Sequence, residues 1–177
     1  MRRGRIINPS PEGLTWLALL EGGFRLKAYQ DGAGKWTISA GCTFYSQGVR
    51  VRRGDRLKDV AAAEALFRER LIEYASNVDA HTRDNINQYE FDALLSFCYN
   101  IGVGAFRAST AVRRFNDKKV SRSSVAEAMG WFHNITDPVS GQLVYDEGLM
   151  ERRRCEAYLL MYGLYRTQRQ PKPEPAL

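Results

Sequence analysis

The sequence predicts a mainly helical α+β protein with a small antiparallel sheet near its N-terminus. Residues 24–57 form short alternating runs punctuated by glycines, the pattern of antiparallel strands joined by tight turns. Most of the remaining chain instead places apolar residues at helical spacing, behind helix start signals. A sheet segment followed by helices predicts two lobes, and a cleft between two lobes is a favoured place for a ligand.

The first expected helix begins at Ser10 and Pro11, a hydroxyl at the N-cap followed by proline at the first helical position. Its apolar face comprises Leu14, Trp16, Leu17 and Leu20. Gly22 and Gly23 should end it. After the sheet segment, residues 60–78 carry an apolar stripe opposite charged residues, which predicts a long helix joining the two lobes.

The next helix should start at Asn87 and be buried, because its run to Ile101 is apolar on nearly all sides. Gly102 and Gly104 are expected to end it. Shorter helices are expected over residues 109–116 and 123–133, a turn-rich loop over 135–145, and a last helix over 147–162.

These elements divide the chain into a basic lead (1–10), one domain (11–166) and a polar, proline-rich tail (167–177) that is expected to be flexible. Within the domain, residues 22–57 form the expected sheet lobe and residues 58–166 the helical lobe. The length of 177 residues is enough for one domain with a core.

The net charge of +6 should attract polyanions such as nucleic acid, anionic lipid or the acidic polymers of a bacterial wall, and charge alone does not choose among them. No helix concentrates side chains that could read bases, so a nucleic-acid partner is not expected. The apolar run of residues 14–20 is too short to span a bilayer, which takes about twenty residues. It leads to no signal-peptide cleavage pattern, so synthesis in a cytoplasm is expected.

Three cysteines (Cys42, Cys98 and Cys155) are odd in number and widely spaced, which argues against a disulfide framework. They have no zinc-ligand spacing with the two histidines, so we expect neither a metal nor another cofactor.

Two carboxylates, Glu21 and Asp31, have contrasting surroundings. Glu21 ends an apolar helix, where the helix dipole and its apolar neighbours favour the protonated form that a general acid needs. Asp31 lies in a polar turn beside backbone amides and Lys35, where it should stay ionised. Taken singly, each has an ordinary explanation as a solvated helix end or a turn residue. Together with Thr37 on the following strand, they predict an acid and base pair for glycosidic bond cleavage.

At these residues the sequence resembles the phage-type lysozymes (endolysins, glycoside hydrolase family 24), whose active site has a Glu, then an Asp or Cys, then a Thr. The resemblance includes Phe24 to Asp31 and Trp36-Thr37-Ile38. It continues through residues 88–102, Gly104-Ala105-Phe106, Ser109-Thr110 and Gly148-Leu149 with Arg152-Arg153 and Glu156. It covers roughly residues 12–165.

The resemblance implies a two-lobed lysozyme-like fold and hydrolysis, without a cofactor, of the β-1,4 bond between N-acetylmuramic acid and N-acetylglucosamine in peptidoglycan. Glu21 would protonate the leaving oxygen, Asp31 would activate water, and Thr37 would help to hold that water. Arg152 or Arg153 would pair with Glu21, and Ser96 and Asn100 are candidate substrate contacts. The protein would act as a monomer without stable membrane insertion, reaching the wall through a holin pore or with a virion.

The spacing of the carboxylates departs from the family pattern, because nine residues separate Glu21 from Asp31 where the family has eight. If Gly22 stood at the acid position, the charged Glu21 would lie on the core side of the helix. Burial of that unpaired charge would cost on the order of several kcal/mol. We therefore expect Glu21 to be the acid, followed by an inserted glycine. A second departure is Cys42, which stands where the family usually has a histidine that forms an ion pair in some members. The absence of that histidine should affect stability or the pH dependence of activity.

Three activities remain open from the sequence. An inverting muramidase predicts about 6.5–9.5 Å between the two carboxyl groups. A binding pseudoenzyme on the same fold is favoured by the unusual spacing. A lytic transglycosylase would cut the same bond without water, and the presence of Asp31 and Thr37 argues against it.

Overall fold

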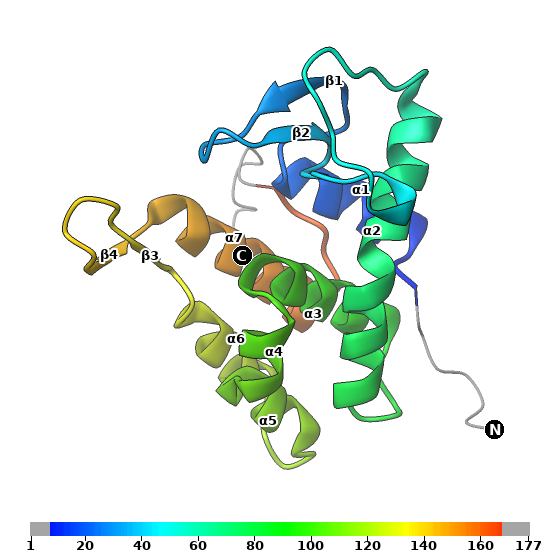
Figure 1. Cartoon of the computed structure of the whole chain (residues 1–177). Helices are drawn as coiled ribbons and strands as arrows, with labels where there is room; N and C mark the ends of the chain where they lie inside the picture. Colours follow the sequence, from blue (N-terminus) through cyan, green and yellow to red (C-terminus); the bar gives the residue numbers. More distant parts are fainter. Residues whose placement is uncertain (1–7, 168–177) are drawn as a thin grey trace, which may run out of the picture.

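The computed structural model describes residues 8–167 and has the expected two lobes (Figure 1). A small sheet lobe lies at one end, most helices lie at the other, and α2 (Val60–His81) runs along both. The predicted α+β, mainly helical fold is confirmed. Most of the expected basic lead and proline-rich tail lies outside the described residues.

The described part of the chain contains seven α-helices: α1 (Pro11–Leu20), α2, α3 (Gln88–Ile101), α4 (Val103–Ala108), α5 (Thr110–Asn116), α6 (Arg122–Gly130) and α7 (Glu147–Tyr162). None of these helices is long and apolar enough to cross a membrane.

The sheet lobe is a twisted ribbon of two antiparallel strands, β1 (Arg25–Gln30) and β2 (Trp36–Ser39). Tyr29 pairs with Thr37, and an irregularity follows toward the start of β1. Isolated bridges continue the pairing into the loop that leads to α2, including one between Lys27 and Arg56. The Asp31 turn therefore lies at the tip of the ribbon.

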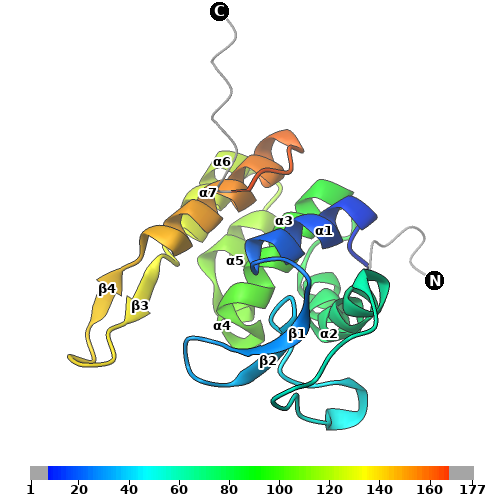
Figure 2. The same cartoon turned by 90° about the horizontal axis from the view of Figure 1, so that it is seen from above.

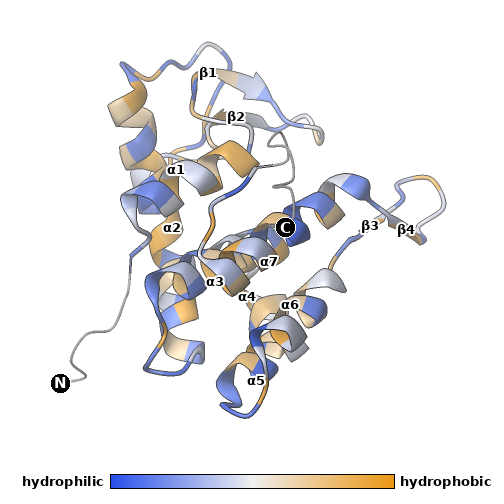
Figure 3. Cartoon of the chain, turned by 180° about the vertical axis from the view of Figure 1, so that it is seen from behind, coloured by the Kyte–Doolittle hydropathy of each residue, from blue (hydrophilic) through white to orange (hydrophobic). Residues whose placement is uncertain are grey.

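The helical lobe is organised around α3. Asn87 and Glu90 form a reciprocal capping box at its start, and every side chain from Glu90 to Cys98 is buried. Helices α7, α2 and α1 all contact it, so α3 is surrounded as its apolar pattern predicted (Figure 2). Hydrophobic residues are prominent on α1 and between the helices, while hydrophilic residues gather around the loops near α5 (Figure 3).

Helix α1 is fixed to α3 at its first turn. The Ser10 hydroxyl accepts a hydrogen bond from the Gly13 amide and donates one to the Asp92 carboxylate at 2.7 Å. Tyr165, beyond α7, donates to the same carboxylate. Burial raises the pKa of Asp92, although these hydrogen bonds oppose the shift. One buried carboxylate thus joins three segments that are distant in the sequence.

Three local expectations were wrong. Residues 135–145 are not an irregular loop but contain a hairpin of β3 (Asn134–Thr136) and β4 (Leu143–Tyr145). Each strand has only three residues, all exposed, so no hydrophobic alternation marked them. A short helix, α4, begins directly after Gly102 because that residue both caps α3 and precedes α4. Helix α6 ends at Gly130, earlier than expected.

Substituting Gly13 by alanine should destabilise the protein, because a Cβ at this position would lie 2.2 Å from Asp92 Oδ2. Relief of that overlap must displace either α1 or the Asp92 network, at a cost of about 1–3 kcal/mol. Urea unfolding measures the loss.

Gly104→Ala is the matched control, since nothing lies within 4 Å of a Cβ there and the residue is helical. It should leave the free energy of unfolding unchanged or slightly higher. Equal stability of the two variants would show that the contact between α1 and α3 is not tight.

Candidate active site

Glu21 lies at the C-cap of α1, where the first helix meets the sheet lobe. The chain leaves the helix through Gly22 and Gly23, whose φ angles of 92° and 85° favour glycine. The Gly23 amide donates back to the Ala18 carbonyl. The glycine pair thus turns the chain away from the helix end, and Trp16 and Leu17 on the apolar face of α1 are buried as predicted.

Arg152 of α7 holds the Glu21 side chain. Its Nη1 donates to Glu21 Oε1 at 2.6 Å, and the Glu21 side chain remains 21% exposed. The other oxygen, Oε2, lies close to Gly41, where a Cβ would be 3.6 Å from it and 3.4 Å from the Tyr99 hydroxyl. The absence of a side chain at Gly41 therefore leaves room beside the exposed part of the carboxyl group.

Behind this ion pair lies a buried cluster of charges. Glu156 is completely buried. Its Oε1 accepts hydrogen bonds from Arg152 Nε at 3.2 Å and from Arg153 Nη2 at 3.1 Å. Arg153 Nε also lies 3.0 Å from Glu156 Oε2. This contact is an ion pair, but its geometry does not form a hydrogen bond. Together with Glu21, the two arginines and two glutamates balance in charge, which allows their burial.

The two arginines of the cluster respond differently to their surroundings. Burial alone would lower the pKa of Arg152, but the carboxylates of Glu21 and Glu156 raise it above the ordinary value. Burial lowers the pKa of Arg153, and Glu156 offsets this only in part. Arg152 is therefore the firmly charged partner of Glu21, while Arg153 is not in contact with it.

The structure places Ser96 and Asn100 against this cluster. Ser96 is completely buried and donates its hydroxyl to Glu156 at 2.7 Å. Asn100 is half-buried, and its carbonyl oxygen accepts from Arg153 at 2.7 Å. The burial of Ser96 does not support a substrate contact, so we assign it the task of orienting Glu156.

Asp31 lies in the turn between β1 and β2. Its Oδ1 accepts the amides of Ala33 and Lys35 at 2.9 and 2.8 Å. These bonds fix the carboxylate and leave Oδ2 without a partner among the described residues. The polar setting expected from the sequence is therefore present.

Thr37 is almost fully buried in β2, with 2% of its surface exposed. Its hydroxyl donates to the Lys35 carbonyl at 3.0 Å, so it can accept a hydrogen bond from a water but must rotate to donate one.

Tyr29 is a residue of the site that the sequence reasoning missed. Burial raises the pKa of its hydroxyl, Arg25 opposes the shift, and the charges of Glu21 and Asp31 add to it. Both carboxylates therefore act on one phenol, which stands opposite Thr37 in the strand register. The alternation of β1 could have identified Tyr29, because a residue paired with Thr37 should share its surroundings.

Cys42 lies beneath the same region and is completely buried. Burial raises the pKa of its thiol to about 11, which Arg70 opposes and Glu21 reinforces. The thiol is therefore neutral and does not replace the charge of the histidine usual in the resembling family.

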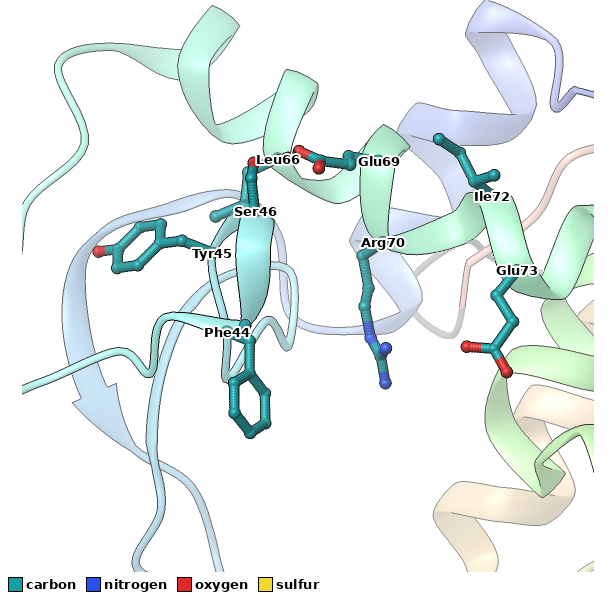
Figure 4. Close-up of a pocket in the computed structure, with 9 residues that line it drawn as sticks. Phe44, Tyr45, Ser46, Leu66, Glu69, Arg70, Ile72 and Glu73 are labelled. Carbon is teal, nitrogen blue, oxygen red and sulfur yellow. Dashed lines mark hydrogen bonds between the residues drawn. The ribbon is translucent and has the colours of Figure 1, made fainter.

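A hollow of about 530 Å³ lies between residues 44–48 and α2. Phe44 and Arg70 extend side by side into the same space, with Glu73 further along the helix (Figure 4). The Arg70 charge also acts on Cys42 and Tyr99, as does that of Glu21, so the hollow adjoins the site.

Comparisons with known proteins agree on one family. A model described as phage lysozyme matches residues 20–156. The endolysin of Acyrthosiphon pisum secondary endosymbiont phage 1 is 33% identical over 150 residues, which cover 85% of this chain and 95% of that protein. The endolysin of Salmonella phage P22 is 34% identical over 152 residues, which cover 86% and 97%.

Solved structures agree with the sequence relatives. An endolysin from the Escherichia coli O157:H7 phage FAHEc1 superposes with a TM-score of 0.84 at 33% identity, covering 93% of this chain and 99% of that one. A mutant of P22 lysozyme superposes with a TM-score of 0.72 at 31% identity, covering 88% and 99%.

Glu156→Gln should destabilise the protein by about 3–5 kcal/mol, because the substitution leaves Arg153 buried without a compensating charge. The free energy of unfolding in urea measures this loss.

Glu147→Gln on the same helix is the control. Glu147 pairs with Arg154 where both side chains are more than half exposed, and such pairs contribute less than about 1 kcal/mol. Similar losses in the two variants would contradict the role assigned to the buried cluster.

Proposed function

This chain belongs to the phage lysozyme family, and on that premise we propose that it is a muramidase whose catalytic residues are Glu21, Asp31 and Thr37. As a peptidoglycan hydrolase it cleaves the β-1,4 bond between N-acetylmuramic acid and N-acetylglucosamine. The observation that carries the residue assignment is the Glu21 carboxyl group, bound on one oxygen by Arg152 and open on the other.

Glu21 is the general acid in this proposal. Arg152 binds Oε1 and fixes the orientation of the carboxyl group, so that Oε2 is the oxygen that meets the glycosidic oxygen. Arg152 also binds Glu156, so the same guanidinium group fixes the Glu21 side chain relative to α7.

Asp31 is the general base that activates water. The two backbone amides on Oδ1 hold the group in place, and Oδ2 is available to the water. Thr37 accepts a hydrogen bond from that water. As the bond breaks, Glu21 transfers its proton to the leaving oxygen, water adds to the anomeric carbon, and Asp31 takes the proton that water releases. This order of steps inverts the configuration at the anomeric carbon, which is consistent with the family.

A pseudoenzyme and a lytic transglycosylase are less favoured. Both proposed carboxylates are present and held by specific partners, which a protein that only binds its substrate does not need. A transglycosylase needs no water, so it gives no reason for the ordered Asp31 turn.

We further propose that the protein acts as a monomer on the bacterial cell wall, and that a holin pore or a virion delivers it there. Nucleic acid is not its partner in this proposal.

Glu21→Gln should reduce the release of reducing sugar from purified peptidoglycan by about 10²–10⁴-fold, the usual contribution of a general acid. The amide can still accept a hydrogen bond from Arg152, so the fold should persist, with circular dichroism as the check.

Glu12→Gln, an exposed substitution on the same helix, is the control and should leave activity unchanged. A folded Glu21→Gln protein with full activity would sink the assignment and favour the pseudoenzyme.

The initial product should be the α-anomer of the newly formed reducing sugar, because inversion of a β-bond produces it. Proton NMR during early hydrolysis identifies the anomer, and mass spectrometry reports any anhydro-sugar. A β-anomer would assign Asp31 as a nucleophile, and anhydro-muropeptides would replace the hydrolase by a transglycosylase.

A further inference from the structure

The positive charge of this protein is concentrated on the sheet lobe, residues 22–57. These residues include seven Lys and Arg and two Asp, a net charge of +5. The other described residues, 8–21 and 58–167, include fourteen Lys and Arg and seventeen Asp and Glu, a net charge of −3. The molecule is therefore an electric dipole whose positive end is the sheet lobe.

The basic side chains of the sheet lobe are also unpaired. Within residues 8–167, none of its seven Lys and Arg forms an ion pair, whereas in the helical lobe seven arginines do (Arg68, Arg83, Arg114, Arg122, Arg152, Arg153 and Arg154). Asp55, the acid nearest to the cluster, accepts the Arg52 amide and the Tyr45 hydroxyl on one oxygen. Among the described residues, the protein therefore pairs many arginines of the helical lobe with carboxylates but none of the sheet lobe.

Four of these residues form one surface, which we call the arginine surface: Arg50, Arg52, Arg53 and Arg56. All four are exposed. They line two adjoining hollows of about 660 and 430 Å³ that share Val49, Arg50 and Arg52. Trp36 also lines the larger hollow, and 52% of Val49 is exposed beside it.

The two hollows of the arginine surface are distinct from the proposed catalytic residues. The segment that follows the 3-10 turn Ser46–Gly48 passes over the sheet lobe on the side opposite α3 to α7 in both views (Figures 1 and 2). Neither hollow is lined by Glu21, Asp31 or Thr37. A glycan strand lying in the cleft would thus leave this surface free.

We propose that the arginine surface binds an anionic phospholipid membrane peripherally. Guanidinium groups match the geometry of phosphate and are weakly hydrated, so they suit a surface of closely spaced phosphates. Trp36 and Val49 add an aromatic and an apolar side chain, which suit the partly apolar headgroup region of the membrane–water interface. The other described residues carry a net charge of −3 and gain nothing from the same membrane, so the charge asymmetry orients the sheet lobe toward the lipid.

The carboxylates of peptidoglycan stem peptides are the competing polyanion. They extend from the glycan strand at the proposed catalytic residues, whereas neither hollow of the arginine surface is lined by Glu21, Asp31 or Thr37. The position of the surface therefore favours a lipid partner.

The test measures co-sedimentation of the protein with vesicles of phosphatidylglycerol and phosphatidylcholine, and with vesicles of phosphatidylcholine alone. The protein should bind the anionic vesicles only, and less tightly as the salt concentration rises. The variant R50Q/R52Q/R53Q/R56Q should lose about tenfold or more in affinity, given the effect of each basic residue at such a surface.

Two further variants separate position from total charge. R107Q/R113Q/K118Q/K119Q removes the same charge from exposed positions of the helical lobe and should change vesicle affinity by less than about threefold. A variant with all four arginines replaced by lysine keeps the charge and should retain most of the binding. Circular dichroism verifies folding of each.

Equal losses from both glutamine variants would overturn the proposal, because binding would then follow net charge alone. So would a loss of binding to purified peptidoglycan sacculi without a loss on vesicles, which would assign the surface to the wall polymer. Because vesicles contain no glycan, the result does not depend on whether the protein is a muramidase.

Discussion

The buried charge cluster on α7 is the constraint on which the site depends. A carboxylate as deeply buried as Glu156 is stable only when cations and hydrogen-bond donors surround it, and Arg152, Arg153 and Ser96 supply these. Ser96 comes from α3, so charge compensation fixes α7 against the central helix. Arg152 then extends from that fixed position to Glu21. The proposed acid is held in place by a helix more than a hundred residues away.

The two carboxylates of the site are held by different means. Glu21 depends on a long-range ion pair between α1 and α7, which the rigid helical lobe maintains. Asp31 depends on amides of its own turn. The two carboxylates are therefore positioned independently of each other. The distance between the two carboxyl groups depends on how the sheet ribbon packs against α2. Neither the end of α1 nor the Asp31 turn determines that distance alone.

The same division between lobes appears in the charges. The helical lobe pairs many of its arginines with carboxylates, which stabilises contacts between helices. The sheet lobe leaves its arginines exposed and unpaired. A lobe too small to bury a large core gains little from internal ion pairs, and its cations remain available to bind partners. The proposed membrane contact and the catalytic turn therefore both belong to this small lobe.

The sequence by itself determined every feature that rests on local signals. Ser10 and Pro11 start α1 as predicted, apolar spacing identified Glu21 rather than Gly22 as the end of that helix, and the last helix has the predicted bounds. Family resemblance supplied the activity and the candidate residues. Where local patterns were weak, prediction failed, as in the three-residue strands of the hairpin and in α4.

Only the tertiary structure decided which side chains meet. It chose Arg152 over Arg153 as the partner of Glu21, buried Ser96 inside the cluster and brought Tyr29 under the influence of both carboxylates. It also gathered four arginines around two adjoining hollows. The physical reason is that helix caps and turns depend on neighbouring residues, whereas burial and charge pairing depend on how distant segments pack.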